Sequence, residues 1–535
     1  MKSKFNKICI MILSVLFLTG CVMGEPPIAT PNPDFAVNLN QSEEEIVSPT
    51  APTAPIAPTM PVVGGQLRVA MPIPTTLNPL LNSDPDVDTV LRLIFEPLVV
   101  IDDDKRPRPN PAITHSVVFS ADGGTLVIHL YDDIFWEDGS PITSADIAFS
   151  IDVLRFWAPE TALHRPNVAN IASHAVLDSR TLQINLISPT WAMKYMLTFP
   201  IIPADYYRNV PMGNLTAPRN MHPLGNGPFR FLSYEAAGSL ELIANEYAAG
   251  GAPYISGVSA MILREIDGTR YAFEQGLTDI LATSPYDWGR YSVMGKNRAA
   301  EVLTGHFDFV GFNARNPLFS GFGARQAVAN SLDLQTALQR YYTQADAAIV
   351  PINPESWLAA YGLREHRYDP ANAAAFFAQL EEVQQITIIV NATNPQGIGI
   401  ATILAEGLKL AGVDATLDIL PFAEFAARVD SADFDIVVGG IVLPPAPYLG
   451  FLHEILGYSS DELSLALSMV RYAQSESALT QAAAVAQHYV AENLPIIGVA
   501  FRRQVLYTAG YVHGDIIIGT DDIFVNVADW FISTP

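Results

Sequence analysis

The sequence predicts a protein of the α/β or α+β class, because strand patterns and helix patterns are intermixed along a chain rich in apolar residues. Apolar residues make up 49% of the 535 residues and charged residues only 16%, which excludes a disordered chain. The length favours more than one domain, and no internal repeat is visible. Alternation predicts strands at 66–71, 98–101, 125–130 and 415–420, whereas helical periodicity predicts helices at 88–95, from 144, at 401–410 and at 477–492.

Two of these helices carry start and stop signals. Thr143 and Asp146 form a pattern typical of a capping box, followed by apolar residues at helical spacing. Gly412 follows the helix expected at 401–410 and provides a C-cap, since glycine adopts the left-handed conformation needed there.

The N-terminus has the pattern of a bacterial lipoprotein signal. Three lysines within the first seven residues precede an apolar stretch at 8–18, which is too short for a stop-transfer helix. The tetrapeptide Leu-Thr-Gly-Cys then ends at Cys21. Removal of a signal peptide at 1–20 would leave Cys21 as an acylated N-terminus, and several acyl chains anchor a protein stably. The alternative is an ordinary secretory signal with a fortuitous cysteine.

The segment 21–64 is predicted to be a tether. Nine prolines between positions 26 and 61 are mixed with Ala, Thr and acidic residues. Such a composition buries too little apolar area to offset its ordering entropy, and its prolines make it a semi-extended spacer. A proline-motif ligand is the alternative interpretation.

Charge and cysteine content exclude several kinds of partner and site. The formal net charge is -25, so nucleic acid and anionic lipid headgroups would be repelled. The second cysteine, Cys9, lies in the apolar run of the signal. After processing only Cys21 remains, which leaves no disulfide and no cysteine-based metal site.

No enzyme is predicted. The chain lacks a nucleophile elbow, a phosphate loop, a dinucleotide fingerprint and a zinc-protease motif. The ten histidines are scattered without ligand spacing, so we expect neither a metal nor another cofactor. A pair of catalytic carboxylates in a cleft is the alternative that the sequence leaves open.

Short motifs follow one another from residue 64 almost to the C-terminus. They are GGQLRVA at 64–70, LNPL at 77–80, FEPLV at 95–99, WEDGSPITSADI at 136–147, GNGPF at 225–229, FN at 312–313 with RQA at 325–327, YDP at 368–370 and FDI at 434–436. In this order the set resembles family 5 of the bacterial extracellular solute-binding proteins. These are receptors of ABC importers for oligopeptides, dipeptides and nickel. Most of the shared residues have a structural explanation, such as the turn at Asp138-Gly139.

The resemblance implies a two-lobed α/β fold of the periplasmic-binding-protein type II, in the large cluster that has an extra subdomain. Lobe I would comprise 65–102, 224–308 and 500–535, the extra subdomain 103–223, and lobe II 309–499. The lobes would close on a ligand by hinge motion, and a permease would bind the closed form.

The resemblance also places one wall of the cleft in a loop at 439–448. In peptide receptors of this family the equivalent loop carries an aspartate that pairs with the α-ammonium of the peptide. Here Pro444 lies near that place and no acid precedes Glu454. Because a buried ammonium without a counter-charge costs several kcal/mol, an apolar or neutral ligand suits this loop better. The contacts expected from it are Gly440, Ile441, Val442, Leu443 and Tyr448.

Other candidate ligand contacts come from regions similar to the family. They are Ser83, Asp84, Pro85, Thr283, Ser284, Phe309, Phe422 and Arg428. Each is equally compatible with a solvent-facing or core position, and for Arg428 an exposed helix charge is favoured. Asp84, Asp86 and Asp88 resemble the start of a calcium loop, but Phe95 occupies the position of the bidentate glutamate, so helix-start electrostatics explain them better.

The resemblance therefore implies a lipid-anchored substrate-binding protein outside the cytoplasm, periplasmic if the cell has an outer membrane. Its expected partners are a small-molecule or peptide ligand, an ABC permease and, through it, ATPase subunits. The membrane would be contacted by the N-terminal lipid only, and the protein would be monomeric. A sensor lipoprotein with the same clamp and a hydrolase on this scaffold are the alternatives. The sequence does not identify the ligand.

Overall fold

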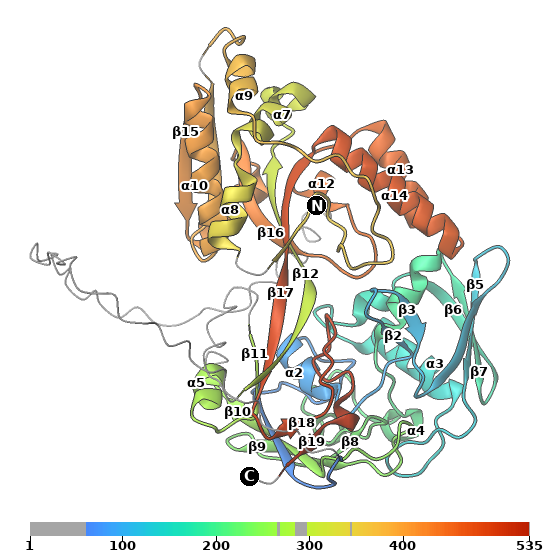
Figure 1. Ribbon diagram of the computed structural model, residues 1–535. Coiled ribbons are helices and arrows are strands. Elements are labelled where there is room, and N and C mark those ends of the chain that lie inside the picture. The colour runs from blue at the N-terminus through green and yellow to red at the C-terminus, as the bar shows by residue number, and fades with distance from the viewer. Residues whose placement is uncertain (1–59, 265–267, 284–296, 343–344, 383, 534–535) are drawn as a thin grey trace, which may run out of the picture. The chain divides into compact units, whose positions relative to one another are not determined.

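The computed structural model describes residues 60–533 except 265–267, 284–296, 343–344 and 383. All the elements reported below lie in the compact unit Pro61–Pro535 and are shown in Figure 1. The predicted signal peptide, Cys21 and nearly all of the predicted tether lie outside the described residues.

The largest sheet has seven strands in the order β11-β17-β12-β16-β14-β15, with β13 added to β17. Their bounds are β11 Ile280–Ala282, β12 Arg298–Phe312, β13 Ala345–Ala347, β14 Gln385–Asn391, β15 Asp414–Leu420, β16 Ile436–Val442 and β17 Ile496–Thr508. β12 pairs antiparallel with both β16 and β17, whereas β14 runs parallel to β15 and β16. The parallel strands are joined through helices, as crossover connections require.

Two four-stranded sheets are formed mainly by the first half of the chain. One has the order β1-β10-β9-β8, with β1 at Gln66–Pro72, β8 at Phe229–Tyr234, β9 at Ser239–Ala244 and β10 at Gly257–Leu263. The other has the order β4-β5-β7-β6, with β4 at Thr114–Phe119, β5 at Thr125–Leu130, β6 at Ile171–Asp178 and β7 at Thr181–Leu186. Small ribbons pair β2 (Val99–Ile101) with β3 (Pro107–Pro109), and β18 (Val512–His513) with β19 (Phe531–Ile532).

The helices surround these sheets (Figure 1). They are α2 Pro85–Leu91, α3 Ser144–Asp152, α4 Ala204–Tyr207, α5 Gly268–Glu274, α6 Pro317–Ser320, α7 Phe322–Ser331, α8 Leu334–Tyr341, α9 Pro370–Phe377, α10 Pro395–Leu410, α11 Phe422–Ser431, α12 Phe451–Glu454, α13 Asp461–Arg471 and α14 Glu476–Asn493. Short π or 3-10 turns lie at η1 Val153–Trp157, η2 Arg165–Val168, η3 Trp191–Thr198, η4 Pro218–Met221 and η5 Val527–Asp529.

The sequence signals of two helices are confirmed. Asp146 accepts hydrogen bonds from the Thr143 amide at 2.7 Å and from the Thr143 hydroxyl at 3.0 Å, and this capping box starts α3. Gly412 follows α10 with φ +86°, the left-handed conformation expected of a C-cap glycine. α10 begins earlier than predicted, because the Asn394 side chain accepts from the Gly397 amide and Pro395 supplies a first helical residue without an amide proton.

Two further predictions of element bounds are wrong. The helix expected at 88–95 is α2 at Pro85–Leu91, because Asp84 caps it by accepting from the amides of Asp86 and Val87. This cap accounts for the acidic cluster as a helix start. The loop expected at 439–448 begins later, because β16 continues to Val442 in register with β12.

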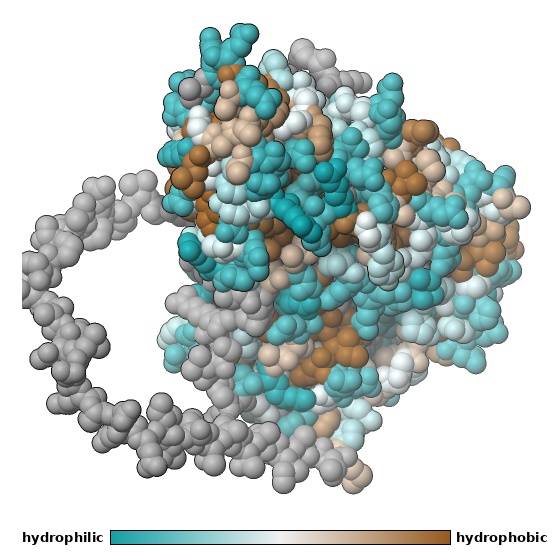
Figure 2. All heavy atoms as spheres, turned by 45° about the horizontal axis from the view of Figure 1, so that its top comes forward, coloured by the Kyte–Doolittle hydropathy of each residue, from teal (hydrophilic) through white to brown (hydrophobic). Residues whose placement is uncertain are grey.

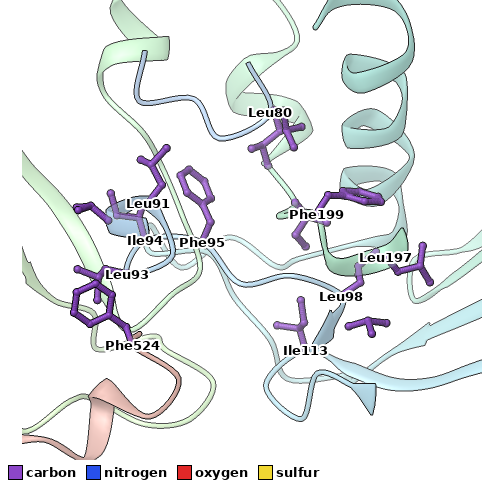
Figure 3. Close-up of a cluster of buried hydrophobic side chains, with 14 of the residues drawn as sticks. Leu80, Leu91, Leu93, Ile94, Phe95, Leu98, Ile113, Leu197, Phe199 and Phe524 are labelled. Carbon is purple, nitrogen blue, oxygen red and sulfur yellow. The ribbon is translucent and has the colours of Figure 1, made fainter. Parts of the chain in front are cut away.

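Two large clusters of buried apolar side chains lie within the described residues. One joins side chains of the two four-stranded sheets and of segments near the C-terminus, and Figure 3 shows Ile94, Phe95, Phe199 and Phe524 within it. The other consists of residues between Val310 and Ala500, packed between β14, β16 and the helices beside them. The sheet of β4 to β7 therefore shares its core with the sheet of β1 and β10, whereas the segment from 310 to 500 has a core of its own.

The WEDG and GNGPF motifs meet each other in the fold. The Glu137 carboxylate accepts from the Gly225 amide at 3.1 Å, and the Glu137 amide donates to the Gly225 carbonyl at 3.0 Å. The amides of Asn226 and Gly227 both donate to the carbonyl of Ile94, at 3.0 and 2.8 Å. The glycines of the GNGPF motif therefore allow a close contact between two backbone segments.

Glu137 gives rise to a prediction about pH. Burial raises the pKa of Glu137 to about 7, although the hydrogen bond from Gly225 opposes the shift. Between about pH 4.5 and pH 7 this carboxyl is therefore protonated in the folded state and ionised in the unfolded chain. The contribution of Glu137 to the free energy of unfolding is fully present below about pH 4.5 and is lost as the pH rises through 7.

We expect Glu137→Gln to raise the free energy of unfolding at pH 8 by about 1–2 kcal/mol, because glutamine keeps an acceptor for Gly225 without the buried charge. Urea unfolding between pH 4 and 8 checks this. The free energy of unfolding of the variant should equal that of the wild type near pH 4 and should fall less steeply up to pH 8. Part of the fall should remain in the variant, because burial also raises the pKa of Glu96 to about 7. An equally steep fall in the two proteins would contradict the prediction.

Among the residues that the structure describes, no helix has both the length and the apolar character needed to cross a membrane. On the face shown in Figure 2, hydrophilic and hydrophobic residues are interspersed.

Candidate functional site

A pocket lies beside the strands β12 and β17, where several segments distant in sequence come together. It has an empty volume of about 430 Å³, part of which is open to solvent. Its apolar lining consists of Gly305, Pro351, Ile352, Leu358, Leu443, Pro444, Pro445, Ala446 and Phe501, and its polar lining of Lys105, Asn353, Ser356 and Thr520. A concave, mostly apolar site with a few polar groups is the common form of a small-molecule binding site.

Pro444, which the family resemblance places near the position of the peptide-clamp aspartate, lines this pocket. Its neighbour Leu443 is held in place by a hydrogen bond from its amide to the Gly305 carbonyl at 2.8 Å. This contact continues the pairing of β12 with β16 beyond Val442. The pocket lining contains no Asp or Glu.

Lys105 is the one charged residue among those lining the pocket. Its side chain is 7% exposed, and its ammonium lies 3.6 Å from a carboxylate oxygen of Glu355. Its backbone has φ +63°, the left-handed region that costs a residue with a side chain about 1 kcal/mol or more. The backbone is fixed by hydrogen bonds from the Lys105 amide to Asp102 and from the Tyr195 hydroxyl to the Lys105 carbonyl.

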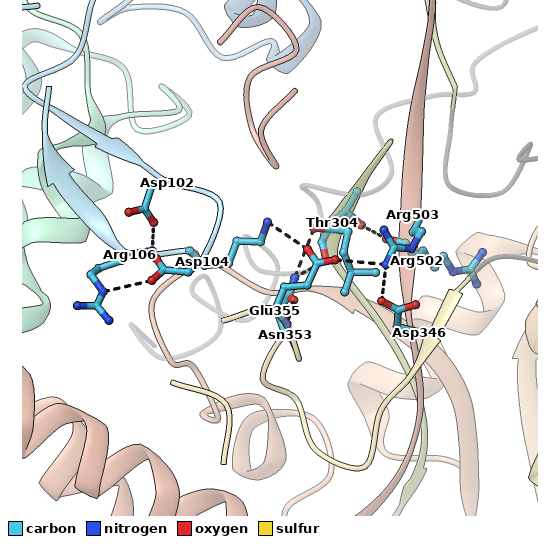
Figure 4. Close-up of polar contacts among 11 residues, drawn as sticks. Asp102, Asp104, Arg106, Thr304, Asp346, Asn353, Glu355, Arg502 and Arg503 are labelled. Atoms are coloured by element: carbon cyan, nitrogen blue, oxygen red, sulfur yellow. Dashed lines mark hydrogen bonds and ion pairs between the residues drawn. The ribbon is translucent and has the colours of Figure 1, made fainter. Parts of the chain in front are cut away.

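Glu355 belongs to a chain of ion pairs that leads from the pocket to β17 (Figure 4). Its second oxygen lies 3.2 Å from Arg503, and Arg503 also pairs with Asp346 at 2.6 Å. Arg106, the neighbour of Lys105 in the chain, pairs with Glu476 at 2.6 Å. These pairs connect the segment around 105 with segments near 355 and 476.

Aromatic contacts reinforce the same connection. The Trp357 indole donates to the Tyr195 hydroxyl at 2.9 Å, and the Trp357 amide donates to the Asp104 carbonyl at 2.8 Å. The Trp357 ring lies 5.5 Å from that of Trp191 and has the guanidinium of Arg106 over it at 4.4 Å. Segments 102–108 and 191–195 are thus bound to segment 353–358 by hydrogen bonds, by an edge-to-face ring contact and by a cation–π contact.

A buried ion pair lies where β12 and β17 are paired. Arg502 donates to Asp308 at 2.6 Å, and the two side chains are 2% and 4% exposed. The Tyr342 hydroxyl donates to the same carboxylate oxygen at 2.8 Å, and Arg502 also donates to Asn394. Burial lowers the pKa of the neighbouring His306 to about 4, although Asp308 opposes the shift. His306 is therefore neutral at pH 7.

The pairing of β12 with β17 shifts register at this point. Asp308 pairs with Ala500, but the next residue, Phe309, pairs with Gly498. One residue of β17 is therefore extra, which is the arrangement of a β-bulge. Gly498 leaves no room for a side chain, since a Cβ there would lie 2.2 Å from the Ala348 carbonyl oxygen.

Of the candidate contacts expected from the sequence, Leu443 lines the pocket. Ile441, Gly440 and Val442 lie on β16, and Tyr448 donates to Glu454 beyond it. Phe309 is 3% exposed and packs against Phe307 and Phe451, so its side chain is part of the protein core.

The remaining candidates lie outside the pocket lining. Ser83, Asp84 and Pro85 form the start of α2. Thr283 is buried and exchanges hydrogen bonds with the backbone of Val505, whereas Ser284 lies outside the described residues. Phe422 begins α11. Arg428, expected as an exposed helix charge, pairs with Asp418 at 2.6 Å and Asp433 at 3.2 Å.

Sequence reasoning missed the polar residues of the pocket. Lys105 stands in a run of charged residues that is typical of a solvated loop, and Thr520 in an unremarkable polar stretch. The one available signal was Pro444, because the family resemblance placed it in the loop that was expected to form a wall of the cleft. The other lining residues surround the same pocket. Within the described ranges, no group of three or more His, Cys, Asp or Glu residues is placed to hold a metal ion.

Comparison with known proteins decides the family. Residues 108–461, more than half of the chain, match the family model described as bacterial extracellular solute-binding proteins, family 5 middle. The chain belongs to this family. It is therefore a solute-binding protein of the kind that acts outside the cytoplasm, and the resemblance predicted from the ordered motifs is confirmed.

Relatives of this family 5 protein differ in the ligands that their names state. A Brucella suis protein, provisionally named an ABC transporter peptide-binding protein, is 25% identical over 372 residues, which cover 67% of this chain and 70% of that one. Heme-binding protein A of Haemophilus influenzae is 22% identical over 396 residues, covering 68% and 71%. The similarity therefore extends to proteins named for different ligands.

The fold is also that of solved family members. The crystal structure of the ABC transporter substrate-binding protein CtaP from Listeria monocytogenes superposes with a TM-score of 0.76 at 18% identity, covering 88% of this chain and 99% of that one. This similarity confirms the predicted two-lobed α/β fold.

Proposed function

We propose that this family 5 protein is the lipid-anchored receptor of an ABC importer and captures a small solute by closure of two lobes. The observation that carries the proposal is the pocket. Its lining residues Lys105 and Thr520 come from one proposed lobe with its subdomain, and those at 351–358 and 443–446 come from the other. The names of relatives and of a solved neighbour as ABC transporter binding proteins support the transport role.

The proposed lobe boundaries fall on the paired strands β12 and β17. Lobe I would consist of 65–102, 224–308 and 500–535, with 103–223 as its subdomain, and lobe II of 309–499. The separate apolar core between Val310 and Ala500 supports this division. The bulge of β17 opposite Asp308 and Phe309 supports a hinge at the same place, since a bulge bends a strand without breaking its sheet.

Closure would bring the contacts around Trp357 and Glu355 into place. In the closed form, bulk water leaves the pocket, and the lobes are held by the aromatic contacts to Tyr195 and by the pair between Lys105 and Glu355. A ligand shifts the population toward this form only through its higher affinity for it. The permease would bind the closed form.

The test combines identification of the ligand with scattering. Protein isolated gently from its native source should carry a small molecule detectable by native mass spectrometry. Ligand-free protein, prepared by unfolding and refolding, should contract in small-angle X-ray scattering when that molecule is added back. Lysozyme treated with the same molecule is the control for buffer effects. Absence of any bound molecule, together with unchanged scattering, would refute the receptor function.

The lipid anchor predicts where the protein is found in the cell. We expect Cys21→Ala to abolish acylation and to move the protein from the membrane fraction to the soluble fraction, because the acyl chains would be its only membrane attachment. Fractionation followed by immunoblotting measures this, with Cys9→Ala as the matched control that should stay in the membrane fraction. Retention of the Cys21→Ala protein in membranes would rule out this mode of anchoring.

A further inference from the structure

We propose that Lys105 and Thr520 form an anion-binding end of the pocket, and that the ligand is a small molecule with an anionic group, such as a carboxylate, on an apolar body. This inference rests on the proposed receptor function and specifies the chemistry of its ligand. It differs from the family's peptide clamp, which uses a protein carboxylate to bind a ligand ammonium.

The ammonium of Lys105 is buried and incompletely satisfied. An ammonium has three donors, and within the described part of the chain the acid within 4 Å of it is Glu355, at 3.6 Å. That distance exceeds the length of a charge-assisted hydrogen bond. Glu355 is also shared with Arg503, whose guanidinium lies closer to it, at 3.2 Å. Lys105 therefore keeps donor capacity that a ligand can use.

The other acids near Lys105 interact with arginines. Asp521 lies in the electrostatic field of Lys105, but Arg92 acts on it more strongly. Asp102 and Asp104, next to Lys105 in the chain, are engaged by the Arg106 amide and by the guanidiniums of Arg108 and Arg106. Because the lining itself has no carboxylate, a cationic ligand group would meet the Lys105 ammonium without a counter-charge.

Thr520 supplies a second, independent donor. Its hydroxyl is buried and has no hydrogen-bond partner among the described residues, although Thr520 lines the same pocket as Lys105. A buried hydroxyl without a partner is costly, and a ligand acceptor would remove that cost. A carboxylate, which has two acceptor oxygens, offers partners for both the hydroxyl and the ammonium.

The left-handed backbone of Lys105 supports a functional role for its position. A residue with a side chain is held at φ +63° only where the surroundings enforce it, and here the hydrogen bonds with Asp102 and Tyr195 do so. The ammonium is thereby fixed before ligand arrives, which lowers the entropic cost of binding. The opposite wall, with Leu443, Pro444 and Phe501, accepts apolar groups.

The experiment uses three probes of nearly equal shape: hexanoate, hexanamide and hexylamine. Isothermal titration of ligand-free, full-length protein should show hexanoate binding at least ~10-fold more tightly than hexanamide, since a hydrogen-bonded charge contributes more than a neutral group. Hexylamine should bind most weakly. Equal affinities for the three probes, preference for the amine, or no binding of hexanoate would overturn the inference.

Three variants separate ligand binding from structural effects. Lys105→Met should reduce hexanoate affinity at least ~10-fold and leave hexanamide affinity unchanged, whereas Thr520→Val should reduce hexanoate affinity several-fold. Glu355→Gln breaks the same ion pair as Lys105→Met but leaves the ammonium free, so hexanoate should bind more tightly. If Glu355→Gln weakens hexanoate binding as much as Lys105→Met does, Lys105 acts only as a link between segments and the inference fails.

Mass spectrometry of the natively bound molecule keeps the two proposals distinguishable. A bound molecule with an anionic group supports both. A bound molecule that has no anionic group refutes the anion-binding end and leaves the receptor function intact.

Discussion

Asp308→Asn should lower the free energy of unfolding by about 3–5 kcal/mol, the range for removal of one partner of a buried ion pair. The side chain of Arg502 is 2% exposed, so its charge would stay buried beside a neutral amide. The substitution preserves the volume of the side chain and therefore isolates the charge. Equilibrium unfolding in urea at pH 7 measures the effect.

The matched control is a pair of the same chemistry nearer to solvent. Arg428 and Asp418 also lie 2.6 Å apart, but their side chains are 22% and 32% exposed. Asp418→Asn should therefore cost less than about 1 kcal/mol, since solvent screens the charges. The double variant Asp308→Asn with Arg502→Met should be more stable than Asp308→Asn alone, because it removes the uncompensated charge. Equal losses at Asp308 and Asp418 would contradict this account.

The position of this ion pair connects stability with the proposed hinge. Asp308 lies on β12 opposite the start of the bulge in β17, and Arg502 lies two residues after Ala500, with which Asp308 is paired. A bulge weakens the local ladder, and a buried ion pair fixes which residues face each other across it. We infer that the pair maintains the strand register while the bulge allows bending.

The fold was predictable because its signals are local and follow one another in sequence. The capping box at Thr143 and the C-cap at Gly412 act within a few residues, and both are present in the structure. Periodicity predicted the strand at 125–130 as it is found. The extent of β16 was not predictable in this way, because Gly439 and Gly440 are unfavourable in a strand and only pairing with β12 retains them there.

The pocket was predictable only in part, for a different physical reason. Its lining combines residues near positions 105, 353, 444 and 520, and their proximity depends on pairing across the whole chain. Resemblance to a family identified the wall at Leu443 and Pro444 because that wall follows a strand. Lys105 has no such pattern, and its burial depends on contacts with the distant Trp357 segment. Phe309 is a candidate that lies outside the lining, because an apolar residue on a central strand packs equally well against the core.

Gly225→Ala should lower the free energy of unfolding by about 3 kcal/mol, at the upper end for adding a methyl group to a packed site. A Cβ at this position would lie 2.0 Å from the carbonyl oxygen of Ile94, whose side chain Figure 3 shows within the core. The Ile94 carbonyl belongs to the backbone and cannot rotate away from the new methyl group as a side chain can. The segments must separate, which also strains the bonds from Asn226 and Gly227 to Ile94 and the contact with Glu137.

Gly213→Ala is the matched control for this last substitution. No atom lies within 4 Å of a Cβ built at Gly213. Alanine there should change stability by no more than about 0.5 kcal/mol, because only the entropy of the unfolded chain is altered. Urea unfolding of both variants separates the close contact from the loss of glycine as such. If Gly225→Ala were as mild as the control, the close contact between the two backbones would not be needed for stability.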